Sequence, residues 1–363
     1  MNIIIPALLL MLTGVVYSGW RLATLAPLPP LWRWIIGLGW GVIFVVVMLC
    51  FIMRTQIPVA VSRILNPLGL SWMVYLLYLV MIFLAIDLLR LIPLLRPWLQ
   101  PSWPLAGLVL GVLIAIFSWG SYTYHQKVRV PLDIQVEKPL EKPLKIIGIS
   151  DLHLGYTIER DELEGWVERI NAEKPDLVLI AGDIVDGDVR PVVEDRLAEV
   201  LNRIEAPIYA SLGNHEYFGG EAHRRQFLSQ TKIQLLCDSV ATFGDAVYLI
   251  GRDDATNTGR KSLQQLTAGL DRSKPILVLD HQPHHLEQAE LAGVDFQLSG
   301  HTHRGQVFPL NLLVDRMYER SHGYHRRGKT QYYVSSGIGI WGGKYRIGTQ
   351  SEYVVIHLLG RAD

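Results

Sequence analysis

Long apolar stretches without charged residues dominate the first third of the chain. Four such windows occur, at residues 3–20, 34–53, 68–86 and 104–124. A helix rises 1.5 Å per residue, so about 20 apolar residues are needed to cross a hydrocarbon core of roughly 30 Å. Tryptophans near the ends of the windows, such as Trp20, Trp34 and Trp103, suit the membrane interface. The pattern predicts four transmembrane helices within residues 1–124. The first should be retained in the mature protein, because no basic segment precedes it.

The pattern changes after residue 145 to short runs rich in β-branched residues, each followed by a polar cluster. The runs are at residues 146–150, 177–181, 208–212, 276–279 and 296–299. Helical spacing of apolar residues occurs at 160–171 and 192–204. Strands that alternate with helices predict an α/β layered sandwich, whose ligands bind beyond the carboxyl ends of strands. We expect this domain to cover residues 146–363, joined to the membrane region by a proline-containing polar linker at 125–145.

Charge is divided in the same way. The chain has 34 Lys+Arg and 34 Asp+Glu, but residues 1–124 hold only six arginines and one aspartate. The zero net charge is therefore +5 in that segment and −5 in the remainder. This division excludes a uniform soluble globule, and the apolar content excludes a disordered or collagen-like chain. The two cysteines, Cys50 and Cys237, fall in different regions, so no structural disulfide is expected.

The loop arginines and lysines give an expected orientation in the cell membrane. Four spans place the amino terminus, the loop between spans two and three, and the soluble domain on one side. That side has six basic residues near the spans, against four on the other side. By the positive-inside rule, the multi-pass protein should carry its soluble domain in the cytoplasm.

The polar clusters together form a candidate metal-ligand set. In chain order they are Asp151-Leu152-His153, Gly182-Asp183, Gly213-Asn214-His215-Glu216, His281 and Gly300-His301-Thr302-His303. Mixed His, Asp and Asn ligands suit divalent Mn, Fe, Zn or Co. A closed structural zinc site is not expected, because no cysteine takes part. Alternate residues of an extended segment point to one side, so each Asp-x-His or His-x-His pair can face a single centre.

This order of motifs resembles the calcineurin-like metallophosphoesterase superfamily, over residues 146–358. Further phrases are similar to its membrane-anchored bacterial branch: Pro175-Asp176-Leu177-Val178, Leu298 to His303, Gly305-Gln306 and Ser335 to Gly339. That branch includes phosphodiesterases of the cell envelope, and some relatives cleave UDP-2,3-diacylglucosamine. The resemblance implies an αββα sandwich that hydrolyses a phosphodiester or pyrophosphate bond, with a lipid-linked substrate as a candidate. The partners would be a phosphoester and the lipid bilayer, and no nucleic-acid motif is present.

The resemblance also implies a binuclear metal centre. One divalent ion would be held by Asp151, His153, Asp183 and His303, and the other by Asp183, Asn214, His281 and His301. Asp183 would bridge the two ions, and a hydroxide between them would attack phosphorus. His215 would not bind metal but would act as a catalytic proton donor or charge stabiliser. Such a pair of ions activates water and clamps the attacking and leaving oxygens.

Several residues have more than one interpretation. Arg304 stands where the family usually has glycine and could contact substrate phosphate or narrow the pocket. Asp280 could orient His281 or add charge behind it. Arg346 could bind substrate phosphate through its guanidinium or form a structural salt bridge. Glu216 could support the ligands or be a solvated acid. A protein of another class, a membrane-bound metal-dependent scaffold or sensor without turnover, is the alternative to an enzyme.

Overall fold

The computed structural model describes residues 4–53 and 56–361, which form two compact units. The first unit is Met1–Gly120 and the second is Ser121–Asp363. The fourth long helix continues from the first unit into the second.

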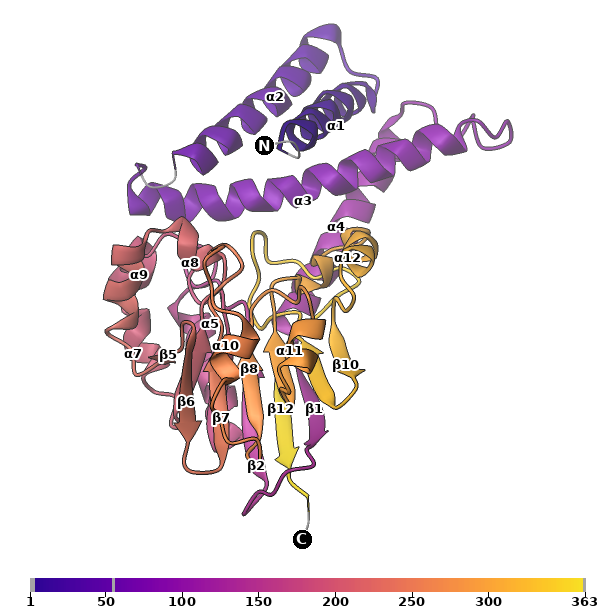
Figure 1. The fold of residues 1–363 in the computed structure, drawn as a ribbon. Helices are drawn as coiled ribbons and strands as arrows, with labels where there is room; N and C mark the ends of the chain where they lie inside the picture. Colours follow the sequence, from indigo (N-terminus) through magenta and orange to yellow (C-terminus); the bar gives the residue numbers. More distant parts are fainter. Residues whose placement is uncertain (1–3, 54–55, 362–363) are drawn as a thin grey trace. The chain divides into compact units, whose positions relative to one another are not determined.

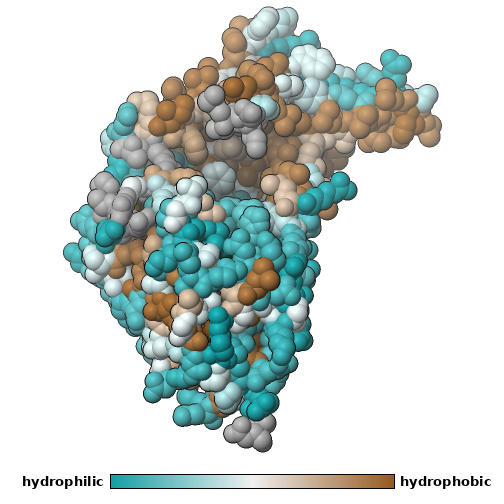
Figure 2. Space-filling model, viewed as in Figure 1, coloured by the Kyte–Doolittle hydropathy of each residue, from teal (hydrophilic) through white to brown (hydrophobic). Residues whose placement is uncertain are grey.

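The first unit is built from four apolar helices, as the sequence predicts. They are α1 (Ile4–Thr24), α2 (Pro30–Ile52), α3 (Val59–Leu89) and α4 (Trp103–His125). All four are long and apolar enough to cross a membrane, and the surface of this unit is largely hydrophobic (Figure 2). Ile3, where the first predicted span begins, lies outside the described residues. The helix α3 extends beyond its predicted window at both ends and contains Pro67.

One ion-pair cluster joins the carboxyl-terminal ends of α1 and α3. Asp87 lies 3.0 Å from Nη2 of Arg21 and 3.0 Å from Nη1 of Arg90, and it accepts a 2.6 Å hydrogen bond from Tyr17. Charged groups in an apolar environment are costly unless they are paired. The cluster therefore accounts for the acidic residue at the edge of this unit.

Two six-stranded sheets form the second unit (Figure 1). In sheet order, the first contains β1 (Lys127–Gln135), β12 (Ser351–Leu359), β2 (Leu144–Ile149), β3 (Leu177–Ala181), β4 (Ile208–Ser211) and β5 (Gln234–Leu235). The second contains β10 (Gly323–Arg327), β11 (Thr330–Val334), β9 (Phe296–Ser299), β8 (Ile276–Leu279), β7 (Val247–Gly251) and β6 (Ser239–Phe243). The strands β2 to β5 are parallel, as are β7, β8, β9 and β11.

A central apolar core joins residues of both sheets, including Leu179 and Ile356 of the first and Leu279 and Leu298 of the second. Helices cover the outer faces: α5 (Arg160–Ala172) and α7 (Leu197–Leu201) contribute to a core on the first sheet, and α10 (Leu263–Thr267) and α11 (Glu287–Leu291) to a core on the second. The other short helices are α6 (Arg190–Glu194), α8 (His215–Phe218), α9 (Glu221–Leu228), η1 (His303–Gly305) and α12 (Leu310–Met317). This arrangement confirms the predicted layered α/β sandwich.

Two local predictions were wrong. The expected linker at 125–145 contains β1, which pairs with β12 along its full length. Its apolar residues alternate, and Pro131 is tolerated because β1 lies at the edge of the sheet. The expected single helix at 192–204 is divided into α6 and α7, because Arg196 adopts a left-handed backbone conformation with φ 51°.

Candidate metal centre

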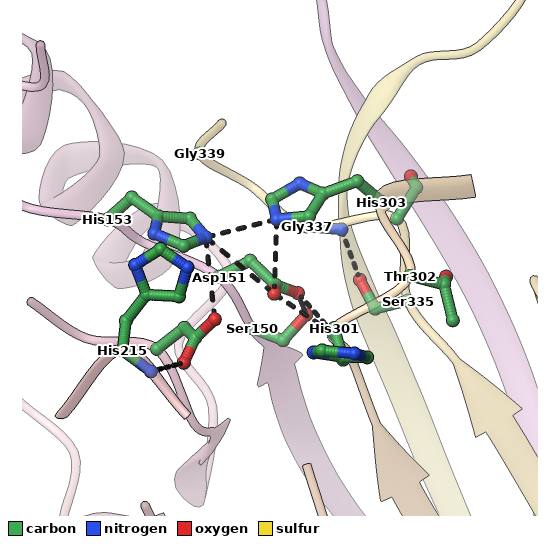
Figure 3. Close-up of polar contacts among 12 residues, drawn as sticks. Ser150, Asp151, His153, His215, His301, Thr302, His303, Ser335, Gly337 and Gly339 are labelled. Atoms are coloured by element: carbon green, nitrogen blue, oxygen red, sulfur yellow. Dashed lines mark hydrogen bonds and ion pairs between the residues drawn. The ribbon is translucent and has the colours of Figure 1, made fainter. Parts of the chain in front are cut away.

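The candidate ligands lie at one edge of the sandwich. Asp151 and His153 follow β2, Asp183 follows β3, Asn214 follows β4, His281 follows β8, and His301 and His303 follow β9. Three of these strands belong to one sheet and two to the other, so both sheets supply side chains to the same place. Figure 3 shows His153 and His303 with their ring nitrogens directed toward each other, and with Asp151 and His215 nearby.

The first group of donor atoms comes from Asp151, His153 and His303. The Nε2 atoms of the two histidines are 3.0 Å apart, and Nε2 of His303 is 3.4 Å from Oδ1 of Asp151. Oδ2 of Asp183 is 3.6 Å from Nε2 of His153. Donors bound to one metal at about 2.1 Å lie roughly 3.0–3.4 Å from one another at tetrahedral or octahedral angles. The distance from Nε2 of His153 to Oδ1 of Asp151 is longer, at 4.0 Å, and the three residues together could hold one divalent ion.

A second group shares Asp183 with the first. The same Oδ2 atom is 3.2 Å from Nε2 of His281. Oδ1 of Asn214 lies 3.2 Å from that Nε2 and 2.8 Å from Nδ1 of His301. Asp183, His281 and His301 form a separate candidate ion site. The structure thus brings all seven predicted ligands together, with the Asp183 carboxylate between the two groups.

The turns that carry the ligands have an unusual backbone. Five of the seven residues have positive φ: Asp151 (54°), His153 (46°), Asp183 (52°), His301 (69°) and His303 (46°). This left-handed region costs roughly 1–2 kcal/mol for a residue with a Cβ. Such strain concentrates at functional sites, where surrounding contacts hold it.

Glycine allows one close approach at these turns. A Cβ placed on Gly213 would lie 2.1 Å from Oδ1 of Asp183. Only glycine permits the β4 turn to pass so near the carboxylate, and this brings Asn214 beside Asp183.

Asp186 is a site residue that the sequence analysis did not select. Its Oδ1 lies 2.7 Å from Nδ1 of His215 and 3.5 Å from Nδ1 of His153. A carboxylate accepts hydrogen bonds, so the Nδ1–H of His215 points to Asp186 and its Nε2 is left on the opposite side of the ring. In the sequence, only its position three residues after Asp183, in the same turn, points to Asp186 as a site residue.

Glu216 supports the ligand turns and is not a solvated acid. It is buried, and its carboxylate accepts hydrogen bonds from the backbone N–H groups of Asp183 (3.1 Å), Val185 (2.9 Å) and Gly213 (2.7 Å). Burial and the nearby charge of Asp183 raise the pKa of Glu216 to about 7. One side chain therefore ties the turn after β3 to the turn after β4.

The ring of His281 is oriented by a backbone carbonyl. Its Nδ1–H donates to the carbonyl oxygen of Ala181 at 2.7 Å, which leaves Nε2 to face Asp183. Asp280 does not hold this ring. It is buried and paired with Arg252 (3.1 Å) and Arg260 (2.9 Å).

Burial and charge determine the protonation of the histidines. Burial, together with the charge of His281, lowers the pKa of His301 to about 3, and burial lowers the pKa of His303 well below its usual value. Burial opposes the charging of His281 as well, but Asp183 and Asp151 outweigh it and raise the pKa of that ring. Neutral imidazole is the form that binds metal, so His301 and His303 are already in it.

The two arginines predicted to bind substrate have different environments. Arg346 is fully buried, and its guanidinium donates to the carbonyl oxygens of His303 (2.8 Å), Ser336 (2.5 Å) and Gly339 (3.0 Å). The geometry favours a structural role over substrate contact, although its partners are carbonyls rather than an acid. Arg304, which follows the candidate ligand His303, has φ 51° and lines a polar cavity of about 250 Å³.

Comparison with known proteins gives a consistent assignment. The calcineurin-like phosphoesterase family matches residues 144–305. An uncharacterized metallophosphoesterase of Campylobacter jejuni is 32% identical over 70% of this chain and 70% of its own length. A counterpart in Helicobacter pylori is 36% identical over 61% of each protein.

A vertebrate relative combines the same two features. A transmembrane protein with a metallophosphoesterase domain from Danio rerio is 32% identical over 69% of this chain. The match spans about three fifths of the Helicobacter and Danio relatives, at 61% and 62% of their lengths. From the fold, the converging donor groups and these matches, the chain belongs to the calcineurin-like metallophosphoesterase family.

Proposed function

We propose that this protein is a membrane-anchored two-metal phosphoesterase that hydrolyses a phosphodiester or pyrophosphate bond. The family generally consists of metal-dependent phosphoester hydrolases. One observation carries the assignment to this chain: Oδ2 of Asp183 is 3.6 Å from His153 and 3.2 Å from His281, which belong to different donor groups. A shared carboxylate between two such groups is the arrangement expected of a binuclear centre.

In this proposal, seven residues hold the two ions. Asp151, His153, Asp183 and His303 would hold one, and Asp183, Asn214, His281 and His301 the other. Bound divalent ions would supply positive charge for the phosphate oxygens and lower the pKa of water. Mn, Fe, Zn and Co all suit these ligands. Glu216 and the Ala181 carbonyl hold the ligands in place, so little reorganisation is needed when substrate binds.

His215 is the proposed catalytic acid. Its Nδ1 is held by Asp186 at 2.7 Å, and its backbone N–H donates to Asp183 at 2.9 Å, which fixes the ring beside the donor groups. The ring is partly exposed, so Nε2 can hold a proton for the departing oxygen. Asp186 acts through His215 as a positioning residue, in addition to its contact with His153.

Replacement of Asp183 tests the binuclear assignment. We expect Asp183→Asn to lower bound metal by at least one ion per chain and to lower hydrolysis of bis-p-nitrophenyl phosphate with Mn²⁺ about 10²- to 10³-fold, because both groups lose their shared charge. Elemental analysis and initial rates measure this. The control is Asp176→Asn. Asp176 directly precedes the first residue of β3 and pairs with the exposed Lys142, so this change should alter neither quantity. Unchanged turnover in Asp183→Asn would refute the mechanism, and bound metal without turnover in the native protein would favour a scaffold.

Substrates with different leaving groups can show whether His215 is a proton donor or a metal ligand. We expect His215→Asn and Asp186→Asn to reduce kcat much more for an alkyl phosphodiester than for a p-nitrophenyl diester, because an alkoxide needs a proton as it departs. A difference of about tenfold or more between the substrates, with metal content retained, supports the acid role. Equal losses on both substrates would contradict it.

Arg304 is proposed to contact an anionic group of the substrate. Since φ is 51° at this position, glycine fits the backbone at least as well as arginine. We expect Arg304→Gly to raise KM about tenfold for a pyrophosphate substrate, to leave kcat nearly unchanged and to alter stability by less than about 1 kcal/mol. Arg196→Gly is a matched control, because it has the same φ and lies on an exposed turn. A KM that does not change would exclude the contact.

We further propose a lipid-linked substrate, such as UDP-2,3-diacylglucosamine, and a cytoplasmic catalytic domain. Four membrane helices support the first point, because they keep the site close to a bilayer. The excess of basic residues on the domain side supports the second.

A topology reporter tests the orientation. Green fluorescent protein fused at the carboxyl terminus should fluoresce, and alkaline phosphatase at the same place should be inactive. The same reporters inserted between α3 and α4 should give the reverse result, because that loop lies across the membrane. Active alkaline phosphatase at the carboxyl terminus would place the domain outside.

A further inference from the structure

The helix α12 presents an apolar face that the domain leaves uncovered. None of its eight residues is buried. Leu310, Leu313 and Met317 are 41%, 57% and 64% exposed, and their spacing of three and four residues places them on one side of the helix. Phe308 and Leu312 add further exposed apolar surface.

This surface is unusual for the second unit. On the face seen in Figure 2, most of the domain surface is hydrophilic. Among the described residues of the unit, eleven large apolar side chains are exposed, and five of them fall within residues 308–317. Contiguous apolar patches of this kind commonly mark a surface that contacts a membrane or another molecule.

The helix lies at the end of the sandwich where the candidate ligands follow β2, β3, β4, β8 and β9. We call this end the metal edge. It begins seven residues after the ligand His303, and the backbone between them folds tightly: a Cβ on Gly305 would lie 2.4 Å from the nitrogen of Asn311. The backbone N–H of Phe308 donates to the carbonyl of Ile347 at 2.7 Å, which fixes the approach to the helix.

The chain enters the domain at the same edge. β1 is parallel to β12, and β12 is antiparallel to β2, so β1 begins at the edge where β2 ends and Asp151 follows. Adjacent strands are about 4.8 Å apart, so the start of β1 lies roughly 10 Å from the end of β2. Figure 1 shows α12 and the start of β1 at one end of the domain and the carboxyl terminus at the other.

Only Gln126 separates β1 from α4, the last helix able to cross a membrane. The end of α4 is also held by the domain. The Tyr124 hydroxyl donates to Glu162, and Nζ of Lys127 lies 3.5 Å from the Tyr124 ring centroid and 3.3 Å from Glu162. The metal edge is therefore next to the end of α4, a helix long and apolar enough to cross a membrane.

The polar surroundings of the apolar face are rich in arginine. Arg316 lies in the last turn of α12, and Arg304 and Arg320 line the polar cavity beside it, together with the acids Asp315 and Glu319. Apolar residues next to arginines suit the boundary between lipid headgroups and acyl chains.

We propose that α12 is an interfacial helix that inserts its apolar face into the bilayer surface and holds the metal edge against the lipid. The bilayer is the proposed occupant because α4, which could cross it, ends at this same edge. This inference goes beyond the proposed hydrolysis and does not require turnover. If the hydrolysis is correct, a lipid-linked phosphoester would reach the metal ions without leaving the membrane.

Fluorescence quenching in the full chain tests the proposal. Cys50→Ala and Cys237→Ser remove both native cysteines, and Leu313→Cys, Met317→Cys, Arg316→Cys or Leu291→Cys then carries an NBD label. The proteins are placed in nanodiscs of phosphatidylcholine and phosphatidylglycerol. Doxyl-labelled lipid reports contact with acyl chains, and iodide reports contact with water. Leu291 is the matched control, since it is 74% exposed and lies at the end of α11 that precedes β9.

We expect doxyl lipid to quench labels at 313 and 317 at least about fivefold more than the label at 291, with position 316 intermediate and iodide showing the reverse order. Iodide quenching at 313 equal to that at 291 would show a helix in water. Protection from both quenchers would show a helix packed on protein, either the chain's own membrane helices or a second copy. Either result would overturn the proposal. If lipid quenches position 313 but no phosphoester is hydrolysed, the interfacial helix stands and the proposed function fails.

Discussion

Two buried carboxylates impose the constraint on which the rest of the site depends. Asp151 and Asp183 have almost no exposed surface, and each would cost several kcal/mol to bury without compensation. The protein surrounds them with donors. Asp151 accepts from Ser150 Oγ at 2.5 Å and the His301 N–H at 3.0 Å, and Asp183 accepts from the His215 N–H at 2.9 Å. Nε2 of His303 lies 3.4 Å from Oδ1 of Asp151, and Nε2 of His281 lies 3.2 Å from Oδ2 of Asp183. Bound cations would balance the remaining negative charge.

The sandwich makes this arrangement possible by bringing five strand ends to one edge. The turns after these strands are short, and each must direct its candidate ligand toward the centre. This requirement accounts for the left-handed backbone conformation of the residues in the turns. Their strain is resisted by side chains that tie separate turns together: Glu216 joins the turns after β3 and β4, and Arg346 joins the His303 carbonyl to the loop after β11. The carboxylate of Glu216 and the guanidinium of Arg346 are fully hydrogen-bonded. Removal of either side chain would leave several buried backbone groups without hydrogen-bond partners. Arg346 thus supports the site from behind the ligands.

The motifs, the strands that precede them and the membrane helices could be predicted because each is a local signal. Long apolar windows can be recognised without tertiary information. So can β-branched runs that are followed by glycine and a residue able to bind metal. The features that were missed depend on distant partners. β1 reads as a polar linker until β12, more than 200 residues away, pairs with it. Arg346 resembles a substrate contact until the carbonyls that surround it are known, and Asp186 has no motif apart from the turn that brings it to His215. The break at Arg196 interrupts an otherwise regular helical period, and its backbone conformation has no clear signature in the sequence.

Strand direction decides at which end of the sandwich the chain enters the second unit. A chain that emerges from a membrane helix can enter a sandwich at either edge, and only one edge carries the ligands. Here β1 runs antiparallel to β2, so the entry point and the candidate ligands share one end of the sandwich, and β12 ends at the opposite one. A single residue separates α4 from β1, and the Tyr124 hydroxyl donates to Glu162, so the end of α4 packs on the domain. The segment predicted as a linker therefore holds the strand that sets the end of the sandwich at which the chain enters it.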